Sequence, residues 1–426
     1  MNVATASLFA LGIAITLSCT SKINIGVLAV SMAWIIGVYL AGMPLSEVLI
    51  GFPTQLFLTL TGVTLLFTLA DVNGTLGRIA ARAVKSCRGN LGLIPVMFFG
   101  LALVFGSIGP GSIASVAILG PMAMAVAGQT GISPFLMTIM VANGAQASSL
   151  SPIAPTGIIV TGLMTKIGLP DTEWYCYVIV MLAHTIVGFA GYLVLGGWRL
   201  FRRSAGGKPL QVAAEIPNGQ PAGGRFEPHH LITLTVIAAV ILLVIGLDVN
   251  VGMAALAGAV LLVLIGAGDE SKAIRGMPWG PILMVSGVTV LVTLIEKTGG
   301  MDLFSALLAS LASTRTVSAV TAAITGTISI YSSTSGVVLP AFLPTVPGIV
   351  LRLGGGDTLA IASSMIVGSH LVDVSPLSTT GALCIAAAPA NTDLRQLFRS
   401  MLAWGFSMAA VAAIGCFIVF GILFSR

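Results

Sequence analysis

Two stretches of the chain combine residues that bind ions with residues that break a helix. SSLSPIAPTG occupies residues 148–157, and VDVSPLSTTG occupies residues 372–381, 224 positions later. Proline lacks a backbone N–H and disrupts helical hydrogen bonding. The helix ends that such a break creates carry free N–H donors and partial positive charge, which suit an anion. Unwound carbonyls and hydroxyls suit Na⁺, so each stretch predicts an ion-binding interruption of a helix.

Two further clusters have the same polar character. GSIGPGSIAS covers residues 106–115, and YSSTSG covers residues 331–336. Glycine lets backbone amides approach a ligand, and Ser and Thr hydroxyls both donate and accept hydrogen bonds. None of the four clusters contains Lys or Arg. We therefore expect an anion to be held by hydroxyls, amides, helix ends and a co-bound cation.

Few ionisable residues fall within the apolar runs. His370 and Asp373 are three positions apart just before the second Ser-Pro, which predicts that both lie on one face of one helix. Their counterparts 224 residues earlier are the neutral Gln146 and Ser149. His184 is predicted to contact a neighbouring helix. An ionisable residue within a membrane is a functional candidate, so His370 and Asp373 are candidates for coupling.

The composition is that of a membrane protein. Hydrophobic residues make up 56% of the 426 residues, charged residues only 8%, and the mean hydropathy is +1.05. Many apolar runs are long enough to cross a bilayer, which needs about 20 residues. We expect an all-α polytopic protein of the inner (plasma) membrane. The net charge of +5 reflects basic loops that orient the spans, and no nucleic-acid partner is expected.

The five cysteines form no CxxC pair, so neither a zinc site nor a disulfide framework is expected. The N-terminus is interpreted as the first span, because no basic segment precedes its apolar stretch.

The chain contains an internal repeat. GVTLLFTLADVNGTLG from residue 62 resembles GVTVLVTLIEKTGGMD from residue 287, and GSIASVAILGP resembles TSGVVLPAFLP. With the Ser-Pro pairs, three matches follow in one order at offsets of 223–225. We predict two repeats, at 1–198 and 231–426, joined by a linker at 199–230. Each would hold a re-entrant hairpin (91–127 and 316–349) and a broken helix (132–165 and 358–390).

Each predicted repeat crosses the membrane five times, so the two are inverted relative to each other. With the linker in the cytoplasm, most of the 19 Lys and Arg residues lie on that side, in agreement with the positive-inside rule. Both termini are then expected outside. The cations of TLGRIAARAVKSCRG recur at steps of three and four, which predicts a helix along the membrane surface, with KTGGMDLFSALLASLAS as its counterpart.

The chain resembles the malonate/dicarboxylate carrier family of the ion transporter superfamily, which is related to the divalent-anion/Na⁺ symporters. The closest likeness lies in NGTLGRIAARAVKSCRGN, GPGSIASVAILGPMAM and GISPFLMTIMVANGAQASSLSPIAPTGIIV. Symporters of this superfamily bind substrate and Na⁺ at Ser-Asn-Thr tripeptides on two hairpin tips and at Thr-Pro segments in the broken spans. The matching tripeptides here are 111–113 and 334–336, and neither contains Asn. The resemblance implies an elevator-type carrier that works as a homodimer.

These motifs and the resemblance define the candidate site. The expected substrate-binding residues are Ser112, Ser151, Pro152, Thr156, Thr334, Ser335, Ser375, Pro376, Thr379 and Thr380. The expected cation-binding or coupling residues are Ser107, Gly111, Asn143, Ser148, Ser332, Gly336, His370 and Asp373. Na⁺ is favoured over H⁺ as the coupling ion, because hydroxyl-rich breaks recur in both halves while the His-Asp pair occurs once. No other cofactor is expected.

The expected function is cation-coupled transport of a small dicarboxylate such as malonate or a C4-dicarboxylate. Alternatives are a carrier of another anion (a tricarboxylate or an inorganic oxyanion) and a passive anion channel, although rings of charge typical of pores are absent. An enzyme is not expected, because no GxSxG nucleophile motif appears. An ATP-driven pump is disfavoured by the absence of GxxxxGK[ST], which leaves a separate ATPase partner open.

Overall fold

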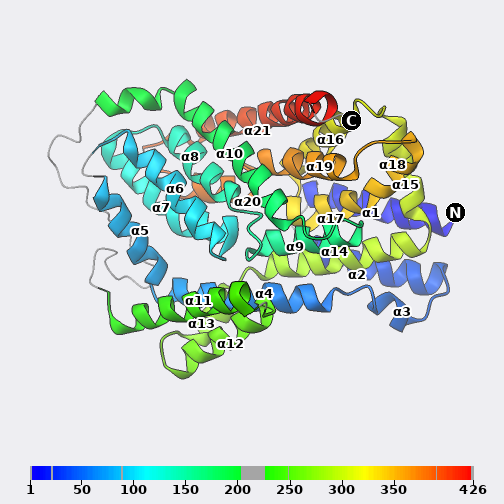
Figure 1. The fold of residues 1–426 in the computed structure, drawn as a ribbon, viewed down its shortest axis with the longest axis horizontal. Coiled ribbons are helices and arrows are strands. Elements are labelled where there is room, and N and C mark those ends of the chain that lie inside the picture. The colour runs from blue at the N-terminus through cyan, green and yellow to red at the C-terminus, as the bar shows by residue number, and fades with distance from the viewer. Residues whose placement is uncertain are drawn as a thin grey trace.

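The computed structural model describes residues 2–20, 23–87, 90–202, 226–247, 249–389 and 391–423. Within these ranges the regular elements are all helices and include no strand, which confirms the all-α class. Most of the predicted linker, at 203–225, lies outside the described residues, as do Lys22 and Arg88. Figure 1 shows the helices running mainly along the long axis of the molecule, with the N and C labels toward one end and α5 at the other.

The first half contains ten α-helices and two short helices of other types among the described residues. In order they are α1 (Val3–Thr20), α2 (Ile25–Trp34), η1 (Ile35–Leu40), α3 (Leu45–Leu49), α4 (Thr54–Val72), α5 (Thr75–Ser86), α6 (Leu93–Ser107), α7 (Gly111–Thr130), α8 (Pro134–Ala147), α9 (Pro155–Lys166), α10 (Glu173–Val194) and η2 (Gly197–Arg202).

The second half follows the same order, with the helix after the hairpin tip divided into short pieces. Its elements are α11 (Pro228–Leu247), α12 (Val251–Leu264), α13 (Glu270–Gly276), α14 (Trp279–Lys297), α15 (Gly300–Ser310), α16 (Val317–Tyr331), η3 (Thr334–Val338), α17 (Leu339–Phe342), η4 (Leu343–Thr345), α18 (Val346–Leu353), α19 (Thr358–Leu371), α20 (Thr379–Ala386), α21 (Leu394–Cys416) and η5 (Phe417–Leu423).

Equivalent helices begin with equivalent caps. The side chain of Asn24 accepts hydrogen bonds from the first turn of α2, and Asn250 does the same for α12. Ser133 caps α8, and Asp357 caps α19. A side-chain oxygen at the N-cap accepts one of the N–H groups that a helix start leaves without a partner. The repeat in the sequence is therefore also a repeat in the signals that start these helices.

The two halves cross-pack through glycines at the centre of the fold. Helix α2 packs against α14, and α4 packs against α12. A Cβ added to Gly287 would lie 2.0 Å from the carbonyl oxygen of Gly26, and one added to Gly62 would lie 2.4 Å from that of Gly252. Small residues allow such close approach of membrane helices. Helices of each half therefore pack directly against helices of the other half.

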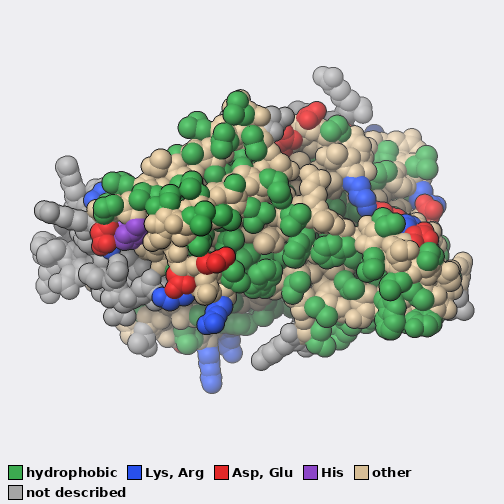
Figure 2. All heavy atoms as spheres, turned by 90° about the horizontal axis from the view of Figure 1, so that it is seen from below, with side chains coloured by type: hydrophobic (Ala, Val, Ile, Leu, Met, Phe, Trp, Pro, Cys, Tyr) green, Lys and Arg blue, Asp and Glu red, His purple; other side chains and the backbone are tan. Residues whose placement is uncertain are grey.

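Among the described residues, six helical stretches are long and apolar enough to cross a membrane: α4, α7, α10, α14, Thr334–Leu353 and Leu394–Ile422. Shorter apolar helices, including α1, α6, α11, α12, α16 and α19, accompany them. Figure 2 shows hydrophobic side chains across the middle of one face, with charged side chains in groups toward its two ends. These features are those of a multi-pass membrane protein. The ten crossings and the inverted orientation of the halves stay predictions.

The two predicted surface segments are helical. Helix α5 carries Arg78 and Arg82, and α15 follows α14 in the equivalent place. Figure 1 shows α5 running obliquely across the direction of α4. The guanidinium of Arg82 lies 4.2 Å above the ring of Phe226, so α5 is attached to the segment that precedes α11.

The predicted orientation can be tested by cysteine labelling in intact cells. Arg82→Cys should react only with reagents that enter the cytoplasm, because positive loops stay inside. Lys166→Cys and Lys297→Cys should react with an impermeant maleimide added from outside. The native cysteines Cys87, Cys176, Cys384 and Cys416 are buried, and the unsubstituted protein measures any background from the five natural thiols. Outside labelling of Arg82→Cys would contradict the predicted topology.

Candidate functional site

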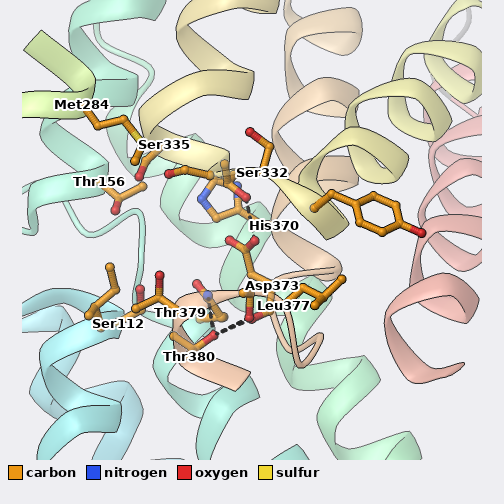
Figure 3. Close-up of a pocket in the computed structure, with 16 residues that line it drawn as sticks. Ser112, Thr156, Met284, Ser332, Ser335, His370, Asp373, Leu377, Thr379 and Thr380 are labelled. Atoms are coloured by element: carbon orange, nitrogen blue, oxygen red, sulfur yellow. Dashed lines mark hydrogen bonds between the residues drawn. The ribbon is translucent and has the colours of Figure 1, made fainter. Parts of the chain in front are cut away.

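The polar clusters of both halves meet around one cavity of about 220 Å³. Four helix starts contribute to it, those of α7 and α9 from the first half and those of η3 and α20 from the second (Figure 3). The cavity is lined by Ser112, Ile113, Gln146, Thr156, Met284, Tyr331, Ser332, Ser333, Thr334, Ser335, His370, Asp373, Leu377, Ser378, Thr379 and Thr380. Nine of these were predicted as site residues: Ser112, Thr156, Ser332, Thr334, Ser335, His370, Asp373, Thr379 and Thr380.

The helix starts of the first half have open N–H groups. Helix α7 begins after Pro110 and α9 begins after Ala154, and neither start has a side-chain cap. Gly111 has φ +78°, a left-handed conformation that other residues rarely adopt. A Cβ on Gly111 would lie 3.1 Å from Cδ of Pro155, so the two starts abut. Uncapped helix starts present N–H donors and partial positive charge, which are suited to an anion.

The helix starts of the second half are capped by serine. Ser333 Oγ accepts the N–H of Gly336 at 3.0 Å, and Ser378 Oγ accepts the N–H of Gly381 at 3.1 Å. Gln146 from the first half reaches the same place, because its Nε2 donates to Thr380 Oγ1 at 3.4 Å. The two halves therefore differ at the cavity although their helices follow the same order.

The carboxylate of Asp373 is held by the second hairpin tip. Thr334 Oγ1 donates to Asp373 Oδ1 at 2.6 Å, and Thr380 Oγ1 donates to the Asp373 carbonyl. The prediction that His370 and Asp373 share one helix face is wrong. Helix α19 ends at Leu371, and Asp373 lies in the following turn, where its N–H donates to the His370 carbonyl at 2.9 Å. The break near Ser375-Pro376 therefore starts before the proline.

His370 faces the cavity beside Asp373 (Figure 3). Its Nδ1 lies 2.9 Å from the Ile366 carbonyl, which can only accept, so Nδ1 carries a hydrogen. Its buried Nε2 has no hydrogen-bond partner among the described residues. His370 thus offers a second polar atom at the site that protein groups do not satisfy.

Ser151 and Ser375, the serines of the two Ser-Pro pairs, do not line this cavity. They hold the two helix breaks in place through hydrogen bonds to backbone carbonyls. Ser151 Oγ donates to the Ser107 carbonyl at 2.6 Å, and Ser375 Oγ donates to the Ile330 carbonyl at 3.3 Å. Each bond joins a broken helix to the end of the first hairpin helix in the same half. In each half, a Cβ on the following glycine, Gly157 or Gly381, would lie 1.9 Å from the serine carbonyl oxygen. Thr-Gly therefore follows Ser-Pro because only glycine leaves room for that carbonyl.

The other predicted residues lie nearby with different partners. Ser107, Ser151 and Pro152 line a second, largely apolar cavity of about 1180 Å³ beside α4, α9 and α10. Ser148 Oγ donates to the Ala145 carbonyl at 2.5 Å. Gly111, Ser148, Gly336, Ser375 and Pro376 line neither cavity.

Asn143 also lies away from both cavities. Its Oδ1 is 2.9 Å from Nδ1 of His184. Helices α8 and α10 are joined by this bond, so the predicted helix-contact role of His184 is confirmed.

Some lining residues were not predicted as site residues. Gln146 occupies the position equivalent to His370, and Ser333 and Ser378 lie inside polar clusters that were recognised as wholes. These three carried a signal in the sequence. Ile113, Tyr331 and Leu377 also lie inside those clusters, whereas Met284 lies outside them. None of the four was singled out, because apolar and aromatic residues of a membrane helix look alike whether they face a cavity, lipid or protein.

Comparison with known proteins gives one family match. Residues 1–149 match the model of the dicarboxylate carrier protein MatC N-terminus. No curated protein matches the chain. The resemblance seen in the sequence is confirmed by this match, which ends at Ser149 next to the first break. Together with the apolar helices, this similarity over the first 149 residues supports a dicarboxylate transporter.

The role of the Thr-Gly pairs can be tested by adding single methyl groups. Gly157→Ala and Gly381→Ala should each destabilise the protein by about 1–3 kcal/mol, because the new Cβ collides with a backbone carbonyl. The measurement is the melting temperature of the purified protein in detergent. Gly162→Ala is the matched control, since it lies in the same helix α9 with nothing within 4 Å of its new Cβ. Equal melting temperatures for all three variants would contradict the close approach.

Proposed function

We propose that this chain, whose first 149 residues carry the dicarboxylate carrier pattern, is a cation-coupled secondary transporter of small dicarboxylates such as malonate or a C4-dicarboxylate. The observation that carries the proposal is the cavity at which helix starts from both halves meet. Breaks at matching positions of two repeats are typical of transporter binding sites. We assign the substrate to this cavity.

The lining of the cavity supports an anionic substrate of small size. Hydroxyls dominate the lining, and none of the described lining residues is Lys or Arg. The uncapped starts of α7 and α9 supply N–H donors for a carboxylate beside Ser112 and Thr156. A volume of about 220 Å³ is below the range of about 300–1,000 Å³ that is usual for drug-sized ligands. It suits a short dicarboxylate better than a bulky tricarboxylate.

Charge balance supports coupling to a cation. Asp373 lines the cavity that would receive a dianion, and like charges repel strongly at low dielectric. A co-bound Na⁺ or a proton removes this repulsion. We place Na⁺ ahead, because the Asp373 carboxylate lies 2.6 Å from the Thr334 hydroxyl, which is also 3.2 Å from the Ser369 carbonyl oxygen. The alternative is a proton carried by Asp373 and His370.

An elevator motion is the mechanism that we propose for translocation. The cross-packed α2, α4, α12 and α14 would form the fixed scaffold, and the hairpins with the broken helices would move as the transport unit. On the predicted outer side, Lys166 at the end of α9 pairs with Glu296 of α14 at 2.9 Å. Movement would break this pair between the two units. Assembly as a homodimer and placement in the inner membrane belong to the same proposal.

Two other functions are considered beside cation-coupled dicarboxylate transport, and substrate and flux measurements distinguish them. A carrier of a tricarboxylate or an inorganic oxyanion would use the same cavity with another substrate preference. A passive anion channel would show flux that does not saturate and needs no cation. A thermal-shift screen of the purified protein against carboxylates and oxyanions, with and without Na⁺, separates the substrates.

Substrate binding at the hairpin tips gives a direct test. Ser112→Leu and Ser335→Leu should each lower malonate uptake by proteoliposomes more than about tenfold, because a branched side chain fills the space that the anion needs. Ser31→Leu, on an exposed position of α2, is the matched control and should retain uptake. Wild-type uptake by both tip variants would assign the tips to packing. Absence of dicarboxylate uptake and binding in the wild type would reject the proposed function.

The coupling ion is tested at Asp373. Asp373→Asn keeps the shape of the side chain and removes its charge. Under Na⁺ coupling, the variant should need at least about tenfold more Na⁺ for half-maximal uptake, since a charged ligand has been lost. Under H⁺ coupling, the variant should lose the pH dependence of uptake, and the wild type should not need Na⁺. Unchanged Na⁺ and pH dependence in the variant would remove Asp373 from the mechanism.

A further inference from the structure

The imidazole of His370 brings an unsatisfied polar atom to the lining of the substrate cavity. Of the buried side-chain N and O atoms that lack a hydrogen bond among the described residues, only His370 Nε2 belongs to a residue that lines this cavity. His370 lies in the last turn of α19 and is 1% exposed. A buried polar atom without a partner costs free energy, so we expect a ligand to supply the partner.

The helix that carries His370 determines which kind of partner is missing. Nδ1 lies 2.9 Å from the Ile366 carbonyl oxygen, one turn earlier in α19, and a carbonyl oxygen can only accept a hydrogen bond. Nδ1 therefore carries the hydrogen of a neutral ring, and Nε2 is left with a lone pair. In this form Nε2 accepts a hydrogen bond and cannot donate one. The missing partner of His370 is therefore a hydrogen-bond donor.

The surroundings of the ring agree with a neutral His370. The other titratable side chains that line the cavity are those of Tyr331 and Asp373. Among the ion pairs of the described residues, none joins His370 to Asp373. The Asp373 carboxylate instead accepts a hydrogen bond from Thr334 Oγ1 at 2.6 Å. A buried charge on the ring would have no ion-pair partner, and such a charge is costly.

Two hydroxyls of the second half are already used as donors to the backbone. Thr380 Oγ1 and Ser378 Oγ each donate to the Asp373 carbonyl. Thr380 Oγ1 also accepts a hydrogen bond from Nε2 of Gln146, which is the first-half counterpart of His370. Gln146 therefore has a protein partner for its side chain at the cavity, whereas Nε2 of His370 has none among the described residues.

We propose that the preferred substrates are small hydroxydicarboxylates, such as malate or tartronate (hydroxymalonate), and that the substrate hydroxyl donates a hydrogen bond to His370 Nε2. At neutral pH both carboxyl groups of a small dicarboxylate are ionised, and an ionised carboxylate can only accept. A hydroxyl is then the donor that such a molecule can offer. This inference rests on the proposed function and narrows its substrate class, with His370 as the residue that determines the preference.

The positions of the other groups at the cavity agree with this assignment. The uncapped starts of α7 and α9 offer N–H donors for carboxylates beside Ser112 and Thr156. His370 lies instead beside Asp373 (Figure 3). A neutral hydroxyl fits next to the Asp373 carboxylate without the repulsion that a carboxylate of the substrate would meet there.

The test measures binding to the purified full-length protein in detergent by isothermal titration calorimetry, at neutral pH and a fixed Na⁺ concentration. It compares dicarboxylates of equal chain length, malate with succinate and tartronate with malonate. In each pair the hydroxylated molecule should bind at least about tenfold more tightly, because its analogue leaves Nε2 of His370 without a partner. Fluorosuccinate, which has fluorine in place of the malate hydroxyl and cannot donate, should bind about as weakly as succinate.

A variant of His370 tests the assignment of the acceptor. His370→Leu removes the ring nitrogen, so the ratio of malate affinity to succinate affinity should fall to about one, mainly through weaker malate binding. Ser363→Ala is the matched control, because Ser363 is buried in the same helix α19 and does not line the cavity, and it should keep the wild-type ratio. If His370→Leu does not fold, the comparison of ligands on the wild-type protein carries the test.

Three results would overturn the inference. They are equal affinity of the wild type for malate and succinate, an unchanged affinity ratio in His370→Leu, and affinity for succinate that falls as the pH rises through the range in which histidine titrates. The last result would mean that Nε2 carries a hydrogen and donates it to a carboxylate. In all three results dicarboxylates still bind, whereas binding of none of the tested dicarboxylates would reject the proposed function itself.

Discussion

The structure depends on how two interrupted helices provide hydrogen-bond partners for their backbone N–H and C=O groups inside an apolar environment. Hydrocarbon offers no hydrogen-bond partners, so a break survives only where protein groups or a cavity satisfy it. Ser151 and Ser375 meet this need by donating to the carbonyls of Ser107 and Ile330. Each break is thereby fixed to the neighbouring hairpin, and the open helix starts face a common cavity. The cavity is therefore a consequence of these two hydrogen bonds.

The position of the breaks also determines which groups face the cavity. Helix starts that point inward supply N–H donors, which favour an anion, and the turns before them supply oxygens, which favour a cation. Both kinds of group come from the same interruptions and face one cavity of about 220 Å³, which under the proposed function an anion and a cation would share. Under the proposed function, mutual neutralisation of the two ions would take the place of the Lys or Arg that a soluble anion site would use. Each ion would then bind weakly without the other, which is the condition for coupled transport.

Much of this arrangement could be predicted from the sequence, because proline, glycine and apolar runs act locally. The breaks after Ala147 and Leu371 open the two segments that contain the Ser-Pro pairs, as the sequence predicts. The direction of a side chain is a tertiary property and could not be predicted. Ser112 and Ser375 are equally plausible ligands in the sequence, yet one faces the cavity and the other binds a carbonyl. The sequence predicts Asp373 on a helix because Pro376 is the nearest residue that ends one, whereas α19 ends at Leu371 and the turn begins at Val372.

A repeated backbone does not require a repeated chemistry. Gly144 and Gly368 occupy equivalent positions, and a Cβ on either would collide with a carbonyl, that of Phe99 or that of Ala322. Packing therefore keeps the same small residue in both halves, since any side chain there would separate the helices. Asp373 lines the cavity, whereas its first-half counterpart Ser149 is buried and does not line it, so the two halves differ in charge at this place. The duplicated fold supplies two breaks and one shared cavity, and the unequal side chains place a carboxylate, that of Asp373, on the second-half side of that cavity. A cavity with two identical sides would have no fixed direction for a pair of opposite charges. Under the proposed function, the single carboxylate would give a bound cation and a bound anion separate sides of the cavity.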